Sequence, residues 1–141
     1  MMGEPQTTGE FLLYQTEDTQ TRIQVRLTDG ALWLTQKQLS DLYQKNVRTI
    51  SEHIRNIYAD EELSTDSTIR KFRIVAPEAA RNVERLVDHY SLEMVLAVGY
   101  RVRSHRGVQF RRWATEQLKS YLVKGFVLDD ERFKRAGDDA Y

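Results

Sequence analysis

The sequence predicts an α+β fold, with a winged helix-turn-helix-like core, small antiparallel β hairpins and two C-terminal helices. Three observations lead to this prediction. Apolar and polar residues alternate on either side of Asp29-Gly30, a dipeptide typical of tight hairpin turns. Residues 35–58 carry apolar side chains at helical spacing in two short segments. Residues 91–126 show two further helical patterns, separated near Gly107.

The first part of the chain predicts a small antiparallel sheet. Residues 11–14 form a first short strand, residues 22–27 a second, and residues 31–34 a third that returns after the turn. In the second strand the apolar side chains are expected to face a core. The alternating polar side chains, Arg22, Gln24 and Arg26, are expected to face water.

Two short amphipathic helices follow within residues 33–58. Thr35 is suited to cap the first helix, and Gln38 three residues later completes a capping box. Residues 44–46 break the pattern, and Asn46 can cap the second helix. The second helix is expected to bury Val47, Ile50, Ile54 and Ile57. Its outward face would then carry Arg48, Thr49, Glu52, His53, Arg55 and Asn56. A polar second helix packed on a first is typical of a helix-turn-helix.

A second hairpin is predicted after an acidic loop at residues 59–66. Residues 68–75 are rich in β-branched and aromatic side chains, residues 76–82 connect, and residues 83–90 return. Such a hairpin stands where a wing would lie, although it could equally be an edge hairpin protected by its charges. A competing interpretation makes residues 77–87 a helix that starts at Pro77. Weak helical periodicity in residues 83–90 favours the hairpin.

The last third predicts two helices. Ser91 is expected to cap the first, and Gly99 inside it indicates close helix packing. The second is expected to end at Lys124-Gly125, with Phe126 contacting the last turn. The predicted inward faces comprise Leu92, Val95, Leu96, Gly99 and Val102 in the first helix, and Phe110, Trp113, Ala114, Leu118, Tyr121 and Leu122 in the second.

Composition limits the function classes. The chain has no cysteine, which excludes disulfides and thiolate metal sites, and no apolar run as long as a membrane span, so a cytoplasmic protein is expected. The formal net charge is zero, but basic residues gather between Gly99 and Gly125 while the ends are acidic. This basic cluster is either a solvated helix face or a phosphate-contacting surface.

The chain is expected to form one domain. Residues 1–9 are predicted to be a disordered N-terminus, and residues 10–127 the helix-turn-helix-containing α+β domain. Residues 128–141 are either an acidic tail or the start of a further C-terminal region.

No constellation of residues predicts an enzyme. The three histidines, His53, His89 and His105, share no metal-ligand spacing with one another or with an acid. No phosphate-binding glycine motif is present, and no serine is marked as activated. We therefore expect neither catalysis, nor a metal, nor a small-molecule cofactor.

Several segments resemble the bacterial RhuM family of virulence-associated proteins. These are residues 33–36, 39–43, 47–54, 70–73, 89–93, 98–104, 106–114 and 119–126, so that the resemblance covers about residues 10 to 135. Residues 110–113, Phe-Arg-Arg-Trp, are also similar to the FR-x-W segment of Bro-N-type domains. The resemblance implies a DNA-binding N-terminal domain followed by a further helical region, and hence that this chain is an N-terminal fragment.

The leading functional prediction is a domain that reads double-stranded DNA, in a virulence-associated or mobile-element regulator, with the second helix in the major groove. The expected base or nearby phosphate contacts are Asn46, Arg48, Thr49, Glu52 and His53. The expected phosphate contacts are Gln36, Lys37, Lys45, Arg70, Lys71, Arg73, Arg101, Arg103, Arg106, Arg111 and Arg112. A homodimer is expected from the twofold symmetry of operator sites. The alternative is a protein-interaction module that docks a partner or its own C-terminal region on the same scaffold.

Overall fold

The computed structural model describes residues 10–78 and 81–128, with side chains over residues 10–75 and 81–120. The described residues contain five strands and five helices. In chain order these are β1 (Glu10–Gln15), β2 (Arg22–Thr28), β3 (Ala31–Thr35), α1 (Gln36–Tyr43), α2 (Val47–Ala59), α3 (Thr65–Thr68), β4 (Ile69–Glu78), β5 (Arg81–Ser91), α4 (Leu92–Arg101) and α5 (His105–Leu128). The predictions for residues 1–9 and 129–141 lie outside the described residues.

The strands form one antiparallel sheet in the order β1-β2-β3-β5-β4, which confirms the α+β class. The β2–β3 turn is the predicted Asp29-Gly30, and both residues have positive φ, 54° and 76°, as a type I′ hairpin requires. The second predicted hairpin is confirmed as β4–β5, and the competing helix over residues 77–87 is wrong. Its strands pair from Ile69↔Tyr90 to Glu78↔Arg81, so they run further than expected.

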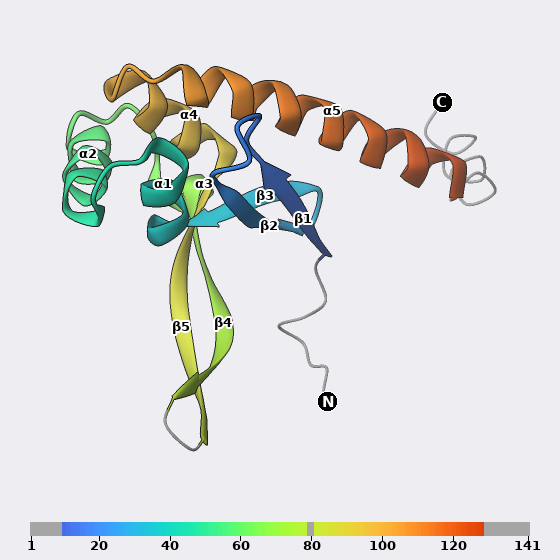
Figure 1. Cartoon of the computed structure of the whole chain (residues 1–141), viewed down its shortest axis with the longest axis horizontal. Helices are drawn as coiled ribbons and strands as arrows, with labels where there is room; N and C mark the ends of the chain where they lie inside the picture. Colours follow the sequence, from blue (N-terminus) through green and yellow to red (C-terminus); the bar gives the residue numbers. More distant parts are fainter. Residues whose placement is uncertain (1–9, 79–80, 129–141) are drawn as a thin grey trace.

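The helices lie on one side of the sheet, while the β4–β5 hairpin projects away from the body (Figure 1). The hydrophobic core fills the space between the helices and the sheet. Ile23, Val25 and Leu34 point from the strands toward buried side chains of α1, α2 and α4. Tyr14 on β1 packs edge-on against Phe110 and Trp113 of α5, with ring centroids 5.0 and 5.1 Å apart.

The joint between α4 and α5 depends on glycine, as the sequence predicts for Gly99. A Cβ on Gly99 would meet the Tyr43 hydroxyl at 2.5 Å, and one on Gly107 would meet it at 3.2 Å. Tyr43 is buried, and its hydroxyl donates a hydrogen bond to the Val95 carbonyl at 2.6 Å. The two glycines therefore allow α4 and α5 to close over the tyrosine ring.

Arg26 corrects the prediction that every polar side chain of β2 faces water. It is only 5 % exposed, because its guanidinium lies over the rings of Phe11 and Phe72 at 4.8 and 4.4 Å from their centroids. The second face of the sheet therefore buries a cation–π cluster. Desolvation is the main reason that the pKa of Arg26 is lowered.

The structure departs from several expectations about the helices. The acidic loop ends in the short helix α3, which starts at the Ser64 cap. In α4 the fully buried residues include Met94 and Val98 rather than Leu96, and Ser91 occupies the cap position without making a side-chain hydrogen bond to the helix. The backbone of α5 continues through Gly125 to Leu128, so Lys124-Gly125 does not end it. The predicted inward side chains Tyr121 and Leu122 lie outside the described side chains.

Candidate nucleic-acid interface

Local hydrogen bonds fix the start of α1 and the turn that leads to α2, and the sequence predicts the capping box among them. The Gln38 amide donates to Thr35 Oγ1 at 3.1 Å, and the Thr35 amide donates to Gln38 Oε1 at 2.9 Å, which completes the capping box. Gln44 ends α1 in the left-handed conformation, with φ 54°. Ser40 Oγ then donates to the Lys45 carbonyl at 2.5 Å, so the three-residue turn has a defined path.

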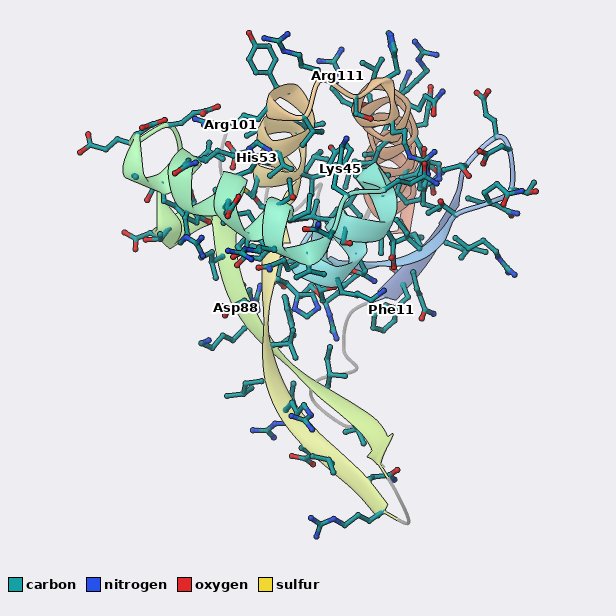
Figure 2. All side chains as sticks on the ribbon, turned by 60° about the vertical axis from the view of Figure 1, so that its left-hand side comes forward. Phe11, Lys45, His53, Asp88, Arg101 and Arg111 are labelled. Carbon is teal, nitrogen blue, oxygen red and sulfur yellow. The ribbon has the colours of Figure 1, made fainter. Side chains whose placement is uncertain are left out.

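Helix α2 begins where predicted and presents a polar outer surface. Asn46 caps it, accepting the Thr49 amide at 2.8 Å. Ile50, Ile54 and Ile57 are buried as expected, but Val47 is 41 % exposed because it lies in the first turn, beyond the edge of the core. Arg48, Glu52, Arg55 and Asn56 are exposed, whereas Thr49 and His53 are half-buried. Figure 2 turns this surface, with Lys45 and His53, toward the reader.

The β4–β5 hairpin is anchored to the end of α2. Tyr58 in the last turn of α2 shares a hydrogen bond of 2.7 Å with Thr68 Oγ1, and Thr68 also donates to the Ser64 carbonyl at 2.5 Å. Because β4 starts at the residue after Thr68, these bonds fix the base of the hairpin relative to the helix. Burial raises the pKa of Tyr58, so its hydroxyl keeps its proton at neutral pH.

The three basic residues of β4, Arg70, Lys71 and Arg73, are each paired with a carboxylate. The distances are 3.0 Å from Arg70 to Asp29, 2.7 Å from Lys71 to Asp88 and 3.6 Å from Arg73 to Glu84. All six side chains are more than 40 % exposed, and such surface pairs contribute only about 0–1 kcal/mol each. A phosphate could therefore replace the carboxylate at little cost.

The basic and polar residues around α1 have similar local partners. Lys37 pairs with Asp41 at 3.1 Å, and Gln36 donates to the Val47 carbonyl at 3.3 Å, which ties the starts of the two helices together. Arg48 lies 3.7 Å from Glu52 on the next turn of α2. Lys45 is exposed and has no ion pair within the described part of the chain.

Two predicted phosphate contacts instead hold the fold together. Arg101 is bound to Asp60 and Glu62, both at 3.0 Å, and these hydrogen bonds raise its pKa. Arg106 reaches back from α5 and donates to the Leu42 carbonyl and, at 2.7 Å, to Thr21 Oγ1. Because both guanidiniums are engaged by partners from distant parts of the chain, we do not assign them to a nucleic-acid surface.

The remaining predicted arginines of the C-terminal third, Arg103, Arg111 and Arg112, lie in the segment that joins α4 to α5 and on α5. Arg111 lies at the end of the molecule opposite the β4–β5 hairpin (Figure 2). Arg103, Arg111 and Arg112 are exposed, and none of them forms an ion pair among the described residues. The predicted basic residues thus divide into a group near α2 and the hairpin and a second group on α4 and α5.

The expected nucleic-acid contacts omitted three basic residues that the fold exposes beside the first group. Arg81 and Arg85 lie exposed on β5, and Arg55 lies exposed on α2, where it donates to Ser51 at 3.1 Å. The alternation of Arg81, Val83 and Arg85 was the available signal. It was missed because the sequence interpretation placed Arg81 in the connector.

Neither a metal site nor a membrane span emerges from the part of the chain that the structure describes. Its acidic and histidine side chains form no group of three that could ligate an ion. Its helices include none long and apolar enough to cross a bilayer.

Comparison with known proteins gives one match. No curated protein and no solved structure matches the chain. The family model described as the virulence protein RhuM family matches residues 67–141. The matched span is more than half of the chain and contains the β4–β5 hairpin, α4 and α5, whereas the resemblance predicted from the sequence also extended over α1 and α2. The chain belongs to the virulence protein RhuM family.

Proposed function

We propose that the chain is a duplex DNA-binding module of a virulence-associated or mobile-element regulator, with α1 and α2 acting as a helix-turn-helix and β4–β5 as its wing. The observation that carries this proposal is α2, which buries three isoleucines on one side and exposes Arg48, Glu52, Arg55 and Asn56 on the other, with Thr49 and His53 half-buried between them. A helix with that division suits insertion into a groove whose edges present hydrogen-bonding groups.

The dimensions suit a duplex. With 13 residues, α2 is about 20 Å long, enough to cross the major groove. With 10 residues, β4 extends about 33 Å, so the hairpin can reach phosphates of the DNA backbone well away from α2. In the proposed complex Arg48, Thr49, Glu52 and His53 face base edges, and Asn46 supports them by capping the helix.

Phosphate contacts come from both sides of α2 in this proposal. Gln36, Lys37 and Lys45 lie around its N-terminal end, where the unpaired backbone amides also favour an anion. Arg70, Lys71 and Arg73 supply the hairpin contacts, and their surface carboxylate partners are exchanged for phosphate oxygens. The arginines on α4 and α5 take no part.

A gel-shift assay on mixed genomic fragments, repeated over a salt series, tests the proposal. If about six phosphates are neutralised, log affinity falls with log salt with a slope of roughly −5, or about three decades over a fourfold rise in salt. Arg73→Gln, a single hairpin contact, should lower that slope by about one. Binding that stays undetectable at low salt would remove the proposal.

A second candidate function is a protein-interaction module on the same scaffold. The pairing of the hairpin and helix cations with local carboxylates favours it, as does the acidic Asp60-Glu61-Glu62 segment at the exit of α2. This candidate predicts no affinity for duplexes at any salt concentration, so the same gel-shift series separates the two functions.

Dimerisation remains a prediction of the DNA-binding proposal. Twofold operator sites require two copies of α2 spaced by about one helical turn of DNA, roughly 34 Å. Light scattering of the complex with duplex DNA would show two protomers per site if the prediction holds, and one if it fails.

A further inference from the structure

A hollow lies between the end of α4 and the beginning of α5, away from the proposed DNA surface. Its volume is about 430 Å³. Leu96, Tyr100 and Val108 supply apolar walls, and Arg103, His105 and Arg111 supply basic groups. We call this hollow the α4–α5 groove. Gly99 and Gly107 leave its floor without side chains, because the Tyr43 ring occupies the space beneath them.

The walls of the α4–α5 groove expose apolar surface. Tyr100 is 83 % exposed, more than the other large hydrophobic side chains that the structure describes, and Val108 is 48 % exposed. Two such side chains facing one hollow are typical of a surface that gains stability when a partner covers it.

The charge of the groove is one-sided. No acidic residue lines it, and neither Arg103 nor Arg111 makes an ion pair within the described part of the chain. The three basic residues of β4, in contrast, have local carboxylate partners. An occupant of the groove must therefore bring negative charge.

A second copy of this chain that presented the same groove does not fit that requirement. If the groove of one copy packed against the groove of the other, arginine would oppose arginine across the twofold axis. Like charges placed in that way suppress association. An acidic partner is the occupant that the charges favour.

We propose that the α4–α5 groove binds an acidic amphipathic segment of another protein. One large apolar side chain of that segment enters between Tyr100 and Val108, and flanking Asp or Glu residues pair with Arg103 and Arg111. Arg111, which lines the groove, lies at the end of the molecule opposite the β4–β5 hairpin (Figure 2). The proposal does not depend on DNA binding.

A selection of random 12-residue peptides displayed on phage against the whole protein tests this. The recovered peptides should combine Asp or Glu with an aromatic or long aliphatic residue. The best of them, synthesised with a fluorescent label, should bind with a Kd below about 100 µM by anisotropy. Its Glu-to-Lys counterpart should bind at least about tenfold more weakly.

Neighbouring arginines provide a matched pair of variants. Arg111→Glu reverses a groove charge and should raise the Kd about tenfold or more. Arg112→Glu makes the same change one residue later, where the side chain lines a different hollow beside Tyr14 and Glu116, and should change the Kd less than about threefold. Tyr100→Ala removes an exposed apolar wall and should also raise the Kd. Circular dichroism of all three checks that they fold.

The proposal is overturned if the selection recovers no binding peptide or if the recovered peptides lack acidic residues. It is equally overturned if Arg111→Glu and Arg112→Glu weaken binding to the same extent. A folded Tyr100→Ala variant that binds as tightly as the parent protein would also refute the placement of the apolar side chain.

Discussion

Replacing Gly99 with alanine should destabilise the protein, because α4 and α5 close over Tyr43 with no room for a methyl group. The new Cβ would lie 2.5 Å from the Tyr43 hydroxyl and 2.9 Å from its Cζ, well inside ordinary van der Waals contact. Tyr43 is 2 % exposed and bonded to Val95, so the ring has nowhere to move.

The expected loss follows from two opposing effects. Inserting a methyl group into a packed site costs about 1–3 kcal/mol, whereas removing glycine from a helix interior contributes about 1 kcal/mol. Because the contact would be as short as 2.5 Å, the packing cost should lie near the upper end, about 2–3 kcal/mol, and we expect Gly99→Ala to lose about 1–2 kcal/mol of unfolding free energy. At Gly107 the corresponding contact is 3.2 Å, so Gly107→Ala should stay within about 0.5 kcal/mol of the parent protein.

Urea denaturation of the two variants, followed by circular dichroism, measures both values. Combining Gly99→Ala with Tyr43→Phe removes the closest contact and should recover about 0.5–1 kcal/mol through coupling of the two sites. The packing argument is refuted if Gly99→Ala is as stable as Gly107→Ala, or if the double variant shows no coupling.

Three further predictions concern stability and the surface of α2. Burial of the His89 ring lowers its pKa, so the unfolded chain binds a proton there more readily than the folded protein does. The unfolding free energy should therefore fall as the pH drops below about 6.5. Urea titrations of His89→Gln at several pH values should show a flatter dependence of this free energy on pH. Arg106→Ala should cost about 2–3 kcal/mol by losing bonds that include the one to the Leu42 carbonyl, and an unchanged melting temperature would contradict that structural role. The pair Arg48→Ala with Thr49→Ala should leave the melting temperature within a few degrees of the parent while weakening DNA binding, and unfolding of this variant would show that the two side chains support the core.

Features that depend on neighbouring residues could be predicted from the sequence. The Asp29-Gly30 turn, the capping box of α1 and the Asn46 cap each involve side chains within three residues of one another. Their geometry follows from local backbone chemistry, and the structure confirms them.

Features that depend on residues distant in the sequence could not be predicted in this way. The alternation of its own strand predicts that Arg26 faces water, but Phe72 from β4 covers it. Arg101 meets Asp60, 41 residues earlier, which removes it from the candidate surface. Sequence spacing could identify the basic residues, but only the fold separates those near α2 from those beside the α4–α5 groove.

Chemical-shift mapping with a duplex DNA titrant tests the central proposal most directly, since it needs no known target sequence. The proposal predicts that amide shifts at low salt concentrate in residues 45–56 of the helix pair and in the β4–β5 hairpin, and that they vanish as salt rises. Shifts confined to the α4–α5 groove, or no shifts at low salt, would contradict the assignment of α2 as the DNA-reading helix.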